Sequence, residues 1–246
     1  MSRTLAFSAL VGLGWLAGCA GPPPPLVPDP PVVKAVAGWG DAFDPKGDCQ
    51  LELSDGQLTI KVPGTPHGLT VQNGDLSSPR ILRPVNGDFV ATVRVAGTFH
   101  PGGKSQSASY LPYDGAGLLL WQDSNNYLRF ERAAIMSDGT LRPYMNYERW
   151  QGGSQVSSRG TPYPDEPVVL RIERKGNQIL ASFSPDGKRW ISLPTIDVKL
   201  SPDLRVGVSA TINSTVPFSP ELSEFQVTGP NVKDPEKAPA PAKDAQ

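Results

Sequence analysis

The chain has 246 residues, a formal net charge of −1 and two cysteines. This length allows one large all-β domain or two small ones. The near-neutral charge gives no electrostatic basis for binding nucleic acid. The stretch Gly102-Gly103-Lys104-Ser105 ends like a phosphate-binding loop, but it lacks the first glycine and no predicted helix follows it. We therefore expect neither nucleic acid nor a nucleotide as a partner.

Residues 1–18 have the pattern of an export signal, with Arg3 followed by an apolar run from Leu5 to Leu16. The run is too short to span a bilayer as a helix. It leads into Leu16-Ala17-Gly18-Cys19, which resembles a bacterial lipobox. The alternative is an ordinary signal peptide cut at a nearby small residue. The resemblance implies a mature chain that begins at a Cys19 carrying fatty acyl chains such as palmitate, which hold it to a membrane.

The lipobox resemblance implies a bacterial cell-envelope protein. Ala20 follows the cysteine, where an aspartate would resemble an inner-membrane retention signal, so the outer membrane is favoured if the cell has one. Lipidation of Cys19 leaves Cys49 alone, and no disulfide within the chain is then expected. We interpret Cys49 as a small buried apolar residue.

Composition divides the mature chain into three parts. Residues 19–37 are rich in proline and predict an extended spacer of polyproline type between the lipidated cysteine and the domain. Residues 230–246 are rich in Pro, Ala and Lys without apolar periodicity, and predict a disordered tail. The folded domain is expected over residues 38–229.

Within the domain, short apolar runs alternate with turn residues and no window shows a sustained helical period. The predicted strands are 49–53, 58–62, 88–96, 115–122, 127–135, 141–150, 168–175, 178–184, 205–212 and 222–229. So many short strands predict a β-sandwich or barrel. Residues 97–114 are poor in strand signals and predict a loop that is either mobile or in contact with a ligand.

Four stretches carry a family resemblance: FDPKGDCQLEL, VPGTPHGL, SSPRILRPVNGDFVATVRV and GAGLLLWQDSNNYLRFERA. Together they resemble the concanavalin A-like lectin/glucanase superfamily. Within it they resemble the domain-of-unknown-function family that includes the yeast regulator of enolase and the non-catalytic C-terminal modules of some β-xylosidases. The resemblance implies a two-sheet antiparallel jelly-roll sandwich with one concave face. One departure is His67-Gly68-Leu69, where the family pattern is His-Asp-Leu.

Strand alternation predicts one polar face on this sandwich. Its candidate ligand-binding residues are Tyr127, Arg129, Glu131, Tyr144, Asn146 and Glu148. In the first hairpin, Leu119 and Trp121 are expected on the opposite side with Leu128 and Phe130. Aromatic rings beside fixed polar groups suit a sugar, which stacks on the ring and forms hydrogen bonds through the hydroxyl groups at its edge. The alternative is a solvated face of cross-strand ion pairs.

Catalysis has little support in the sequence. Glucanases of the superfamily carry paired carboxylates on one strand, whereas Glu131, Glu148 and Glu173 lie one per strand with arginines nearby. A paired arginine lowers the pKa of a carboxyl, which suits neither a general acid nor a strong base. The favoured function is a membrane-anchored, non-catalytic glycan-binding lipoprotein. The alternatives are an assembly lipoprotein that binds envelope proteins and, less favoured, a glycoside hydrolase.

No cofactor is expected other than a structural calcium ion. Asp41, Asp44 and Asp48 are hard oxygen donors close together in sequence, although Asp-Pro-x-Gly is also ordinary turn chemistry. Zinc is not expected, because His67, His100 and Cys49 show no ligand spacing.

The stretch SFSPDGKRWISL (182–193) nearly matches the Asp box of sialidases, but one residue is missing between Asp186 and Gly187. We interpret it as a hairpin turn in which Gly187 has a positive φ and Trp190 packs on the sheet.

Overall fold

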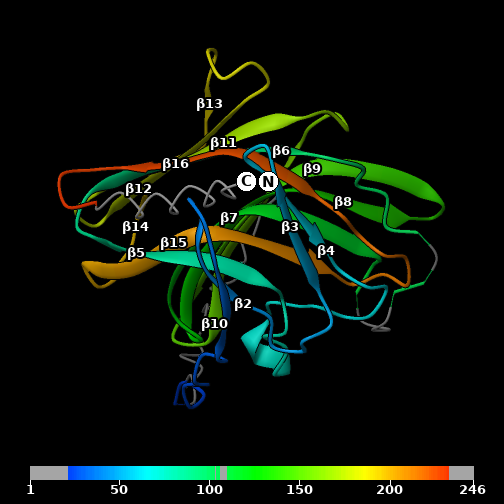
Figure 1. Cartoon of the computed structure of the whole chain (residues 1–246), viewed down its shortest axis with the longest axis horizontal. Coiled ribbons are helices and arrows are strands. Elements are labelled where there is room, and N and C mark those ends of the chain that lie inside the picture. The colour runs from blue at the N-terminus through cyan, green and yellow to red at the C-terminus, as the bar shows by residue number, and fades with distance from the viewer. Residues whose placement is uncertain (1–21, 103, 106–109, 233–246) are drawn as a thin grey trace, which may run out of the picture.

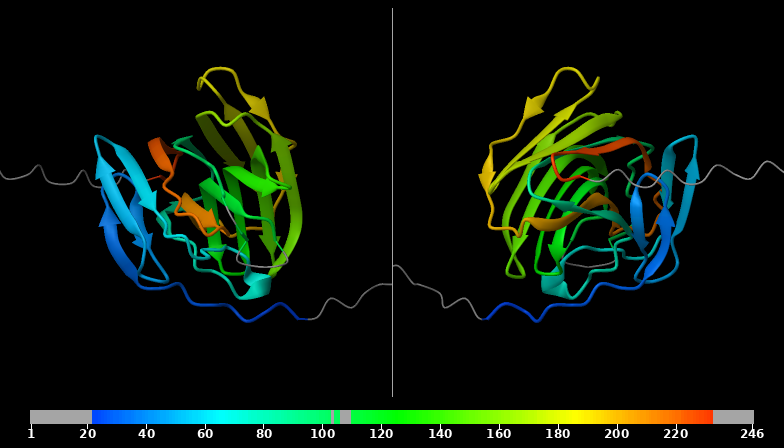
Figure 2. Two further views of the ribbon diagram at one scale, coloured as in Figure 1. Left: turned by 90° about the vertical axis from the view of Figure 1, so that its right-hand side faces the viewer. Right: turned by 60° about the vertical axis from the view of Figure 1, so that its left-hand side comes forward.

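The computed structural model describes residues 22–102, 104–105 and 110–232. Two antiparallel β-sheets pack face to face in a sandwich, which confirms the predicted all-β jelly-roll fold (Figure 1, Figure 2). The described helical structure is one short 3-10 turn, η1 (Val71–Asn73). Over the described residues, no helix is long and apolar enough to cross a membrane.

Sheet A contains eight strands. In spatial order they are β1 (Val32–Val36), β2 (Gly40–Phe43), β5 (Arg80–Asn86), β15 (Asp203–Ile212), β7 (Tyr113–Asp123), β8 (Asn126–Ser137), β9 (Thr140–Gln151) and β10 (Ser154–Pro162). Sheet B also contains eight strands. Its order is β13 (Ile191–Ser192), β12 (Gln178–Ser184), β11 (Val168–Lys175), β6 (Phe89–Ala96), β16 (Glu221–Thr228), β4 (Gln57–Lys61) and β3 (Gln50–Ser54), and β14 (Ile196–Asp197) also pairs with β12.

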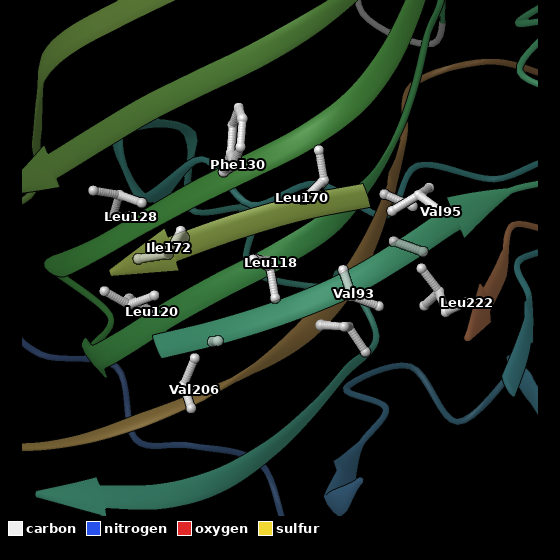
Figure 3. Close-up of a cluster of buried hydrophobic side chains, with 14 of the residues drawn as sticks. Val93, Val95, Leu118, Leu120, Leu128, Phe130, Leu170, Ile172, Val206 and Leu222 are labelled. Atoms are coloured by element: carbon white, nitrogen blue, oxygen red, sulfur yellow. The ribbon is translucent and has the colours of Figure 1, made fainter. Parts of the chain in front are cut away.

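The core lies between the two sheets. Leu118, Leu120, Leu128 and Phe130 of β7 and β8 meet apolar side chains of β6 and β11 in sheet B, where Val93 and Ile172 are also fully buried (Figure 3). Each of these residues alternates with one that points to the other face of its own sheet. Burying this continuous apolar layer holds the sandwich together, and it leaves the outer face of sheet A available for a site.

All ten predicted strands are present, with ends shifted by a few residues. The prediction missed β1, β2, β5, β10, β13 and β14. β5 contains Pro84 and two arginines, and β10 is an exposed edge strand without apolar alternation. β13 and β14 have two residues each, too few to show a period.

The prediction that Leu119 and Trp121 share a side with Leu128 and Phe130 was wrong. A β-bulge between Trp121 and Asp123 shifts the register of the β7–β8 hairpin by one residue. Leu119 therefore pairs with Arg129, and Trp121 pairs with Tyr127. A one-residue shift moves a side chain to the opposite face of the sheet, so the polar face gains two large apolar residues.

Two of the predicted aspartate–glycine turns have a glycine with the expected positive φ. Asp138 and Gly139 have φ values of 51° and 72°, both positive, as a two-residue hairpin turn requires. Gly187 has φ 70°, and Asp186 Oδ1 accepts hydrogen bonds from the backbone N–H groups of Lys188 and Arg189, each at 2.9 Å. Trp190 is only half-buried, with the Arg171 guanidinium 4.3 Å from its ring centroid.

The proline-rich segment differs from a free spacer, because its described part lies against the domain. The Val27 N–H donates to Ser124 Oγ at 2.8 Å, and Asp29 accepts a hydrogen bond from the buried Arg80 at 3.4 Å. Residues 32–36 form β1, which pairs with β2 at the edge of sheet A. Figure 2 shows the segment running along the end of the sandwich that carries η1. Cys19, the signal segment 1–18 and tail residues 233–246 lie outside the described residues.

Candidate functional site

Strand register places all six predicted ligand-binding residues on the outer face of sheet A. Along β8 and β9, Tyr127 pairs with Trp150, Arg129 with Glu148, and Glu131 with Asn146. Tyr144 pairs with Ala133 on the same face. The two strands alternate in phase, so the polar side chains of one stand directly beside those of the other.

A network of buried charges occupies the middle of this face. Arg129 Nε and Nη2 donate to Glu148 Oε2 at 2.9 and 2.6 Å, and Arg129 Nη1 lies 3.6 Å from Glu131 Oε2. Asn146 Nδ2 donates to both carboxylates, at 3.2 and 3.1 Å. Thr211 on β15 adds a hydrogen bond to Glu131, whose side chain is fully buried. The Arg129 guanidinium is thus the counter-charge of two carboxylates that are both shielded from water.

The Glu148 carboxylate and the Arg129 guanidinium stabilise each other's charged forms. Burial raises the pKa of Glu148, but the Arg129 guanidinium and three hydrogen bonds outweigh burial and hold that pKa below its usual value. Burial lowers the pKa of Arg129, but Glu131 and Glu148 outweigh it and raise that pKa well above its usual value. The site therefore keeps a fixed pattern of charge at neutral pH.

A tyrosine closes one side of the network. Tyr113 at the start of β7 donates its hydroxyl hydrogen to Glu131 Oε2 at 2.7 Å. Burial and then the Glu131 carboxylate raise the Tyr113 pKa well above its usual value, so the hydroxyl stays a donor. The Arg129 guanidinium lies 5.9 Å from the Tyr113 ring centroid.

Three aromatic rings form a stacked row beside the charged network. The Trp121 and Tyr127 ring centroids are 5.3 Å apart, and those of Tyr127 and Trp150 are 5.5 Å apart. Trp150 Nε1 donates to Glu148 Oε2 at 3.3 Å, which links the row to the network. The Tyr127 hydroxyl donates to the carbonyl of Leu69 at 2.9 Å, which ties the loop before β5 onto the row.

A cavity of about 510 Å³ opens over this face. Sheet A supplies Tyr113, Arg129, Ile135, Tyr144, Glu148, Trp150, Gln155, Thr211 and Ile212, and the loops supply Pro66, Gly68, Thr70, Gln72, Asn73, Asp75, Tyr110, Leu111 and Asn213. Small-molecule sites span about 300–1,000 Å³, so this cavity has the size of a binding site. It combines an ion pair in its floor with aromatic and amide groups on its walls.

The cavity separates the six predicted residues into two groups. Arg129, Tyr144 and Glu148 line it, whereas Glu131 and Asn146 are buried and hydrogen-bonded to lining residues, and Tyr127 is buried and stacked on the lining residue Trp150. Sequence reasoning missed the wall formed by residues 66–75, because Pro and Gly there signal only turns. For residues 97–114 the sequence left a mobile loop and a ligand-contacting loop as alternatives, and Tyr110, Leu111 and Tyr113 of that stretch line the cavity.

Gly68 also lies in this wall. A Cβ atom built at Gly68 would lie 2.2 Å from Asp75 Oδ2. The Asp75 carboxylate thus fills the space that a side chain at position 68 would occupy. An acidic group lines this part of the cavity, but it comes from another position in the loop.

The structure does not gather the three aspartates expected to bind calcium. Asp41 lies on β2, exposed, and Asp44 Oδ2 accepts the Cys49 backbone N–H at 2.9 Å. Asp48 Oδ1 lies 2.8 Å from His67 Nε2. Cys49 is half-buried and free, so it is more exposed than expected.

Comparisons with known proteins agree with this fold. A family described as "Protein of unknown function (DUF1349)" matches residues 65–230. A search of curated proteins found no match. A functionally unknown protein from Saccharomyces cerevisiae has a similar solved structure, with TM-score 0.59 and 19% identity over 74% of this chain and 92% of that chain.

A second solved structure is the GH43 protein BlXynB from Bacillus licheniformis. It is 14% identical, with TM-score 0.55, over 75% of this chain and 35% of that chain, so the likeness spans about a third of that protein. At these identities the likenesses show a shared fold. The family match covers well over half of the sequence, and the chain therefore belongs to the DUF1349 family of proteins of unknown function.

Proposed function

We propose that this domain binds a glycan, without cleaving it, in the cavity on sheet A. The observation that carries the proposal is the combination of Tyr113, Tyr144 and Trp150 with the Arg129–Glu148 pair in one cavity. Sugar rings stack on aromatic faces, and their hydroxyl groups bond to fixed donors and acceptors. The network beneath the floor holds these groups in place before a ligand arrives, which reduces the entropy lost on binding.

The same geometry favours binding over hydrolysis. Glycoside hydrolysis uses one protonated carboxyl as an acid and a second carboxylate as a base or nucleophile. Glu148 is held ionised by Arg129, and Glu131 lies fully buried beneath the lining, bonded to Tyr113 and Asn146. Neither carboxyl is placed as a proton donor facing the cavity.

We propose further that the domain belongs to a bacterial envelope lipoprotein held to its membrane through Cys19. The support is the stretch Leu16-Ala17-Gly18-Cys19 after an apolar export signal. A surface-anchored protein with a concave polar site suits the capture of polysaccharide, peptidoglycan included.

A glycan array probed with the full chain tests the binding proposal. Tyr144 is half-buried on the cavity wall, so Tyr144→Ala should keep the fold and weaken binding about threefold to tenfold. Trp190→Ala is the matched control, because Trp190 is a half-buried aromatic residue outside the cavity lining that follows β12 of sheet B. It should leave binding unchanged.

Three results would overturn the proposal. One is an array on which the full chain binds no glycan. Another is unchanged affinity in Tyr144→Ala for every glycan that binds. The third is the release of new reducing ends from a bound oligosaccharide, which would make the domain a hydrolase.

A further inference from the structure

A cluster of metal-ligating side chains lies outside the cavity. It consists of Asp48, Cys49 and His67, whose ligand atoms all lie within 4.8 Å of one another. His67 is fully buried, Cys49 is half-buried, and Asp48 is exposed. The cluster therefore opens to solvent through Asp48, which gives an ion a path to a donor set that is otherwise shielded by protein.

The two ring nitrogens of His67 each face an oxygen atom, one from the backbone carbonyl of Thr65 and one from the Asp48 carboxylate. Nδ1 lies 2.8 Å from the carbonyl oxygen of Thr65, which can only accept, so Nδ1 carries a hydrogen. In the neutral ring, Nε2 then presents its lone pair to Asp48 Oδ1 at 2.8 Å. Two acceptors at this distance need a cation or a proton to hold them together. A backbone carbonyl on the far nitrogen is also the usual support of a metal-binding histidine.

Two of the three distances between the ligand atoms fit a single ion after a small adjustment. In a tetrahedral zinc site, nitrogen and oxygen ligands lie about 3.3 Å apart, and sulfur and oxygen ligands about 3.5 Å apart. The His67–Asp48 distance is 2.8 Å, and Cys49 Sγ lies 3.8 Å from Asp48 Oδ1. Each distance is within about 0.5 Å of the tetrahedral value, and the exposed Asp48 side chain can move by that amount.

A neighbouring aspartate adds a buried acceptor beside the cluster. Asp44 Oδ1 is buried and has no hydrogen-bond partner among the described residues, while its other oxygen accepts the Cys49 N–H. A buried carboxylate oxygen without a partner costs free energy unless something neutralises it. A divalent ion beside Cys49 would offset part of the negative charge that Asp44 and Asp48 bring to this place.

We propose that Asp48, Cys49 and His67 form a zinc-binding site with a fourth position open to water. A thiolate, an imidazole and a carboxylate suit zinc better than calcium, which prefers oxygen ligands alone. The site would also brace the cavity. The backbone of His67 exchanges hydrogen bonds with Ile212 at 3.0 and 3.1 Å, and its neighbours Pro66 and Gly68 line the cavity wall.

Metal titration of the full chain, freed of metal with a chelator, tests the proposal. We expect one zinc ion per chain, and a cobalt(II) complex with the charge-transfer absorption of a thiolate ligand. Cys49→Ser should remove that absorption. Cys49→Ser and Asp48→Asn should each weaken zinc binding by about tenfold or more. Both changes keep His67 itself, although Asp48→Asn alters the group that faces His67 Nε2, and circular dichroism verifies that both variants fold.

Asp41→Asn is the matched control, because Asp41 is an exposed aspartate seven positions before Asp48 and outside the cluster. It should leave the affinity unchanged. A chain that binds no stoichiometric zinc would overturn the proposal and leave His67 and Asp48 as an ion pair only. Zinc affinity that neither Cys49→Ser nor Asp48→Asn alters would overturn it as well. These readouts do not depend on glycan binding.

Discussion

At the scale of single residues, Arg129 determines the charge balance of the site. It is the guanidinium that bonds to Glu148 and lies beside Glu131, and all three side chains are buried. Removing it leaves two carboxylates in a low-dielectric environment with only neutral donors around them. Breaking a buried ion pair from one side costs more free energy than removing both partners, because the remaining charge has lost its compensation.

We therefore expect Arg129→Met to lower the free energy of unfolding by about 3–5 kcal/mol at pH 7. In the wild type, the Glu148 pKa is lowered on folding, so its stabilising contribution is present above about pH 4.5 and falls as the pH drops through the folded-state pKa. In the variant, Glu148 has no cation, and protonation relieves the repulsion. The loss of unfolding free energy caused by Arg129→Met should therefore be smaller at pH 5 than at pH 7, as measured by denaturant unfolding.

Arg171→Met is the control for that experiment. Arg171 lies on β11 of sheet B, half-buried against the Trp190 ring, and among the described residues its partners are this ring and the Ser182 hydroxyl, to which Nε donates at 3.1 Å. Its replacement should change the unfolding free energy little and with no dependence on pH. Equal losses for Arg129→Met at pH 7 and pH 5 would contradict our account of the site.

At the scale of elements, the stacked aromatic row holds the loop that forms the cavity wall. Tyr127 on β8 reaches out of sheet A and donates its hydroxyl to Leu69 in the loop before β5. That loop contains little regular secondary structure. Within it lie the 3-10 turn η1 and a β-bridge between Thr70 and Asp75. Its position over sheet A therefore depends on contacts from the sheet.

We expect Tyr127→Phe to loosen this loop. The change keeps the stacked ring and leaves a buried carbonyl with one donor fewer, at a cost of about 1 kcal/mol. Hydrogen exchange should become faster at the amides of Thr70, Gly74 and Asp75, which bond within the loop. Tyr147→Phe on β9 is the control, because the Tyr147 hydroxyl is buried without a hydrogen-bond partner among the described residues. Unchanged exchange in Tyr127→Phe would show that the hydroxyl does not hold the loop.

At the scale of the whole molecule, the segment before the sandwich determines how the domain is positioned relative to the proposed anchor at Cys19. Its described part lies on the domain, with Asp29 bonded to Arg80 and Arg205 and with Val27 bonded to Ser124. Residues 22–36 are therefore not a free tether between Cys19 and the fold. If Cys19 carries the proposed lipid, the end of the sandwich beside this segment lies close to the membrane.

Cys19→Ser tests the proposed anchor. The change should move the protein from the membrane fraction to the soluble fraction or stop its processing, because a thioether needs the cysteine sulfur. Cys49→Ser is the matched control and should stay with the membrane. Mass spectrometry of the wild-type mature N-terminus should find a diacylated cysteine. An unmodified N-terminus at another residue would refute the anchor.

The amino-acid sequence by itself determined the all-β fold and most of its strands. Strand periodicity is local, so the alternation in residues 88–96 and the aspartate–glycine turn at 138–139 could be interpreted without tertiary contacts. The same periodicity put Arg129 and Glu148 among the site residues. It failed for Trp121, because the bulge that sets its face is a property of the paired hairpin.

Only the tertiary structure decided which residues meet across the chain. Asp75, Tyr110 and Asn213 reach the cavity from three separate loops, and no spacing in the sequence relates them. The cluster of Asp48, Cys49 and His67 joins residues that lie 18 and 19 positions apart in the sequence. Such contacts depend on how the two sheets close on each other, which is set by burial of the whole apolar layer and not by any local pattern.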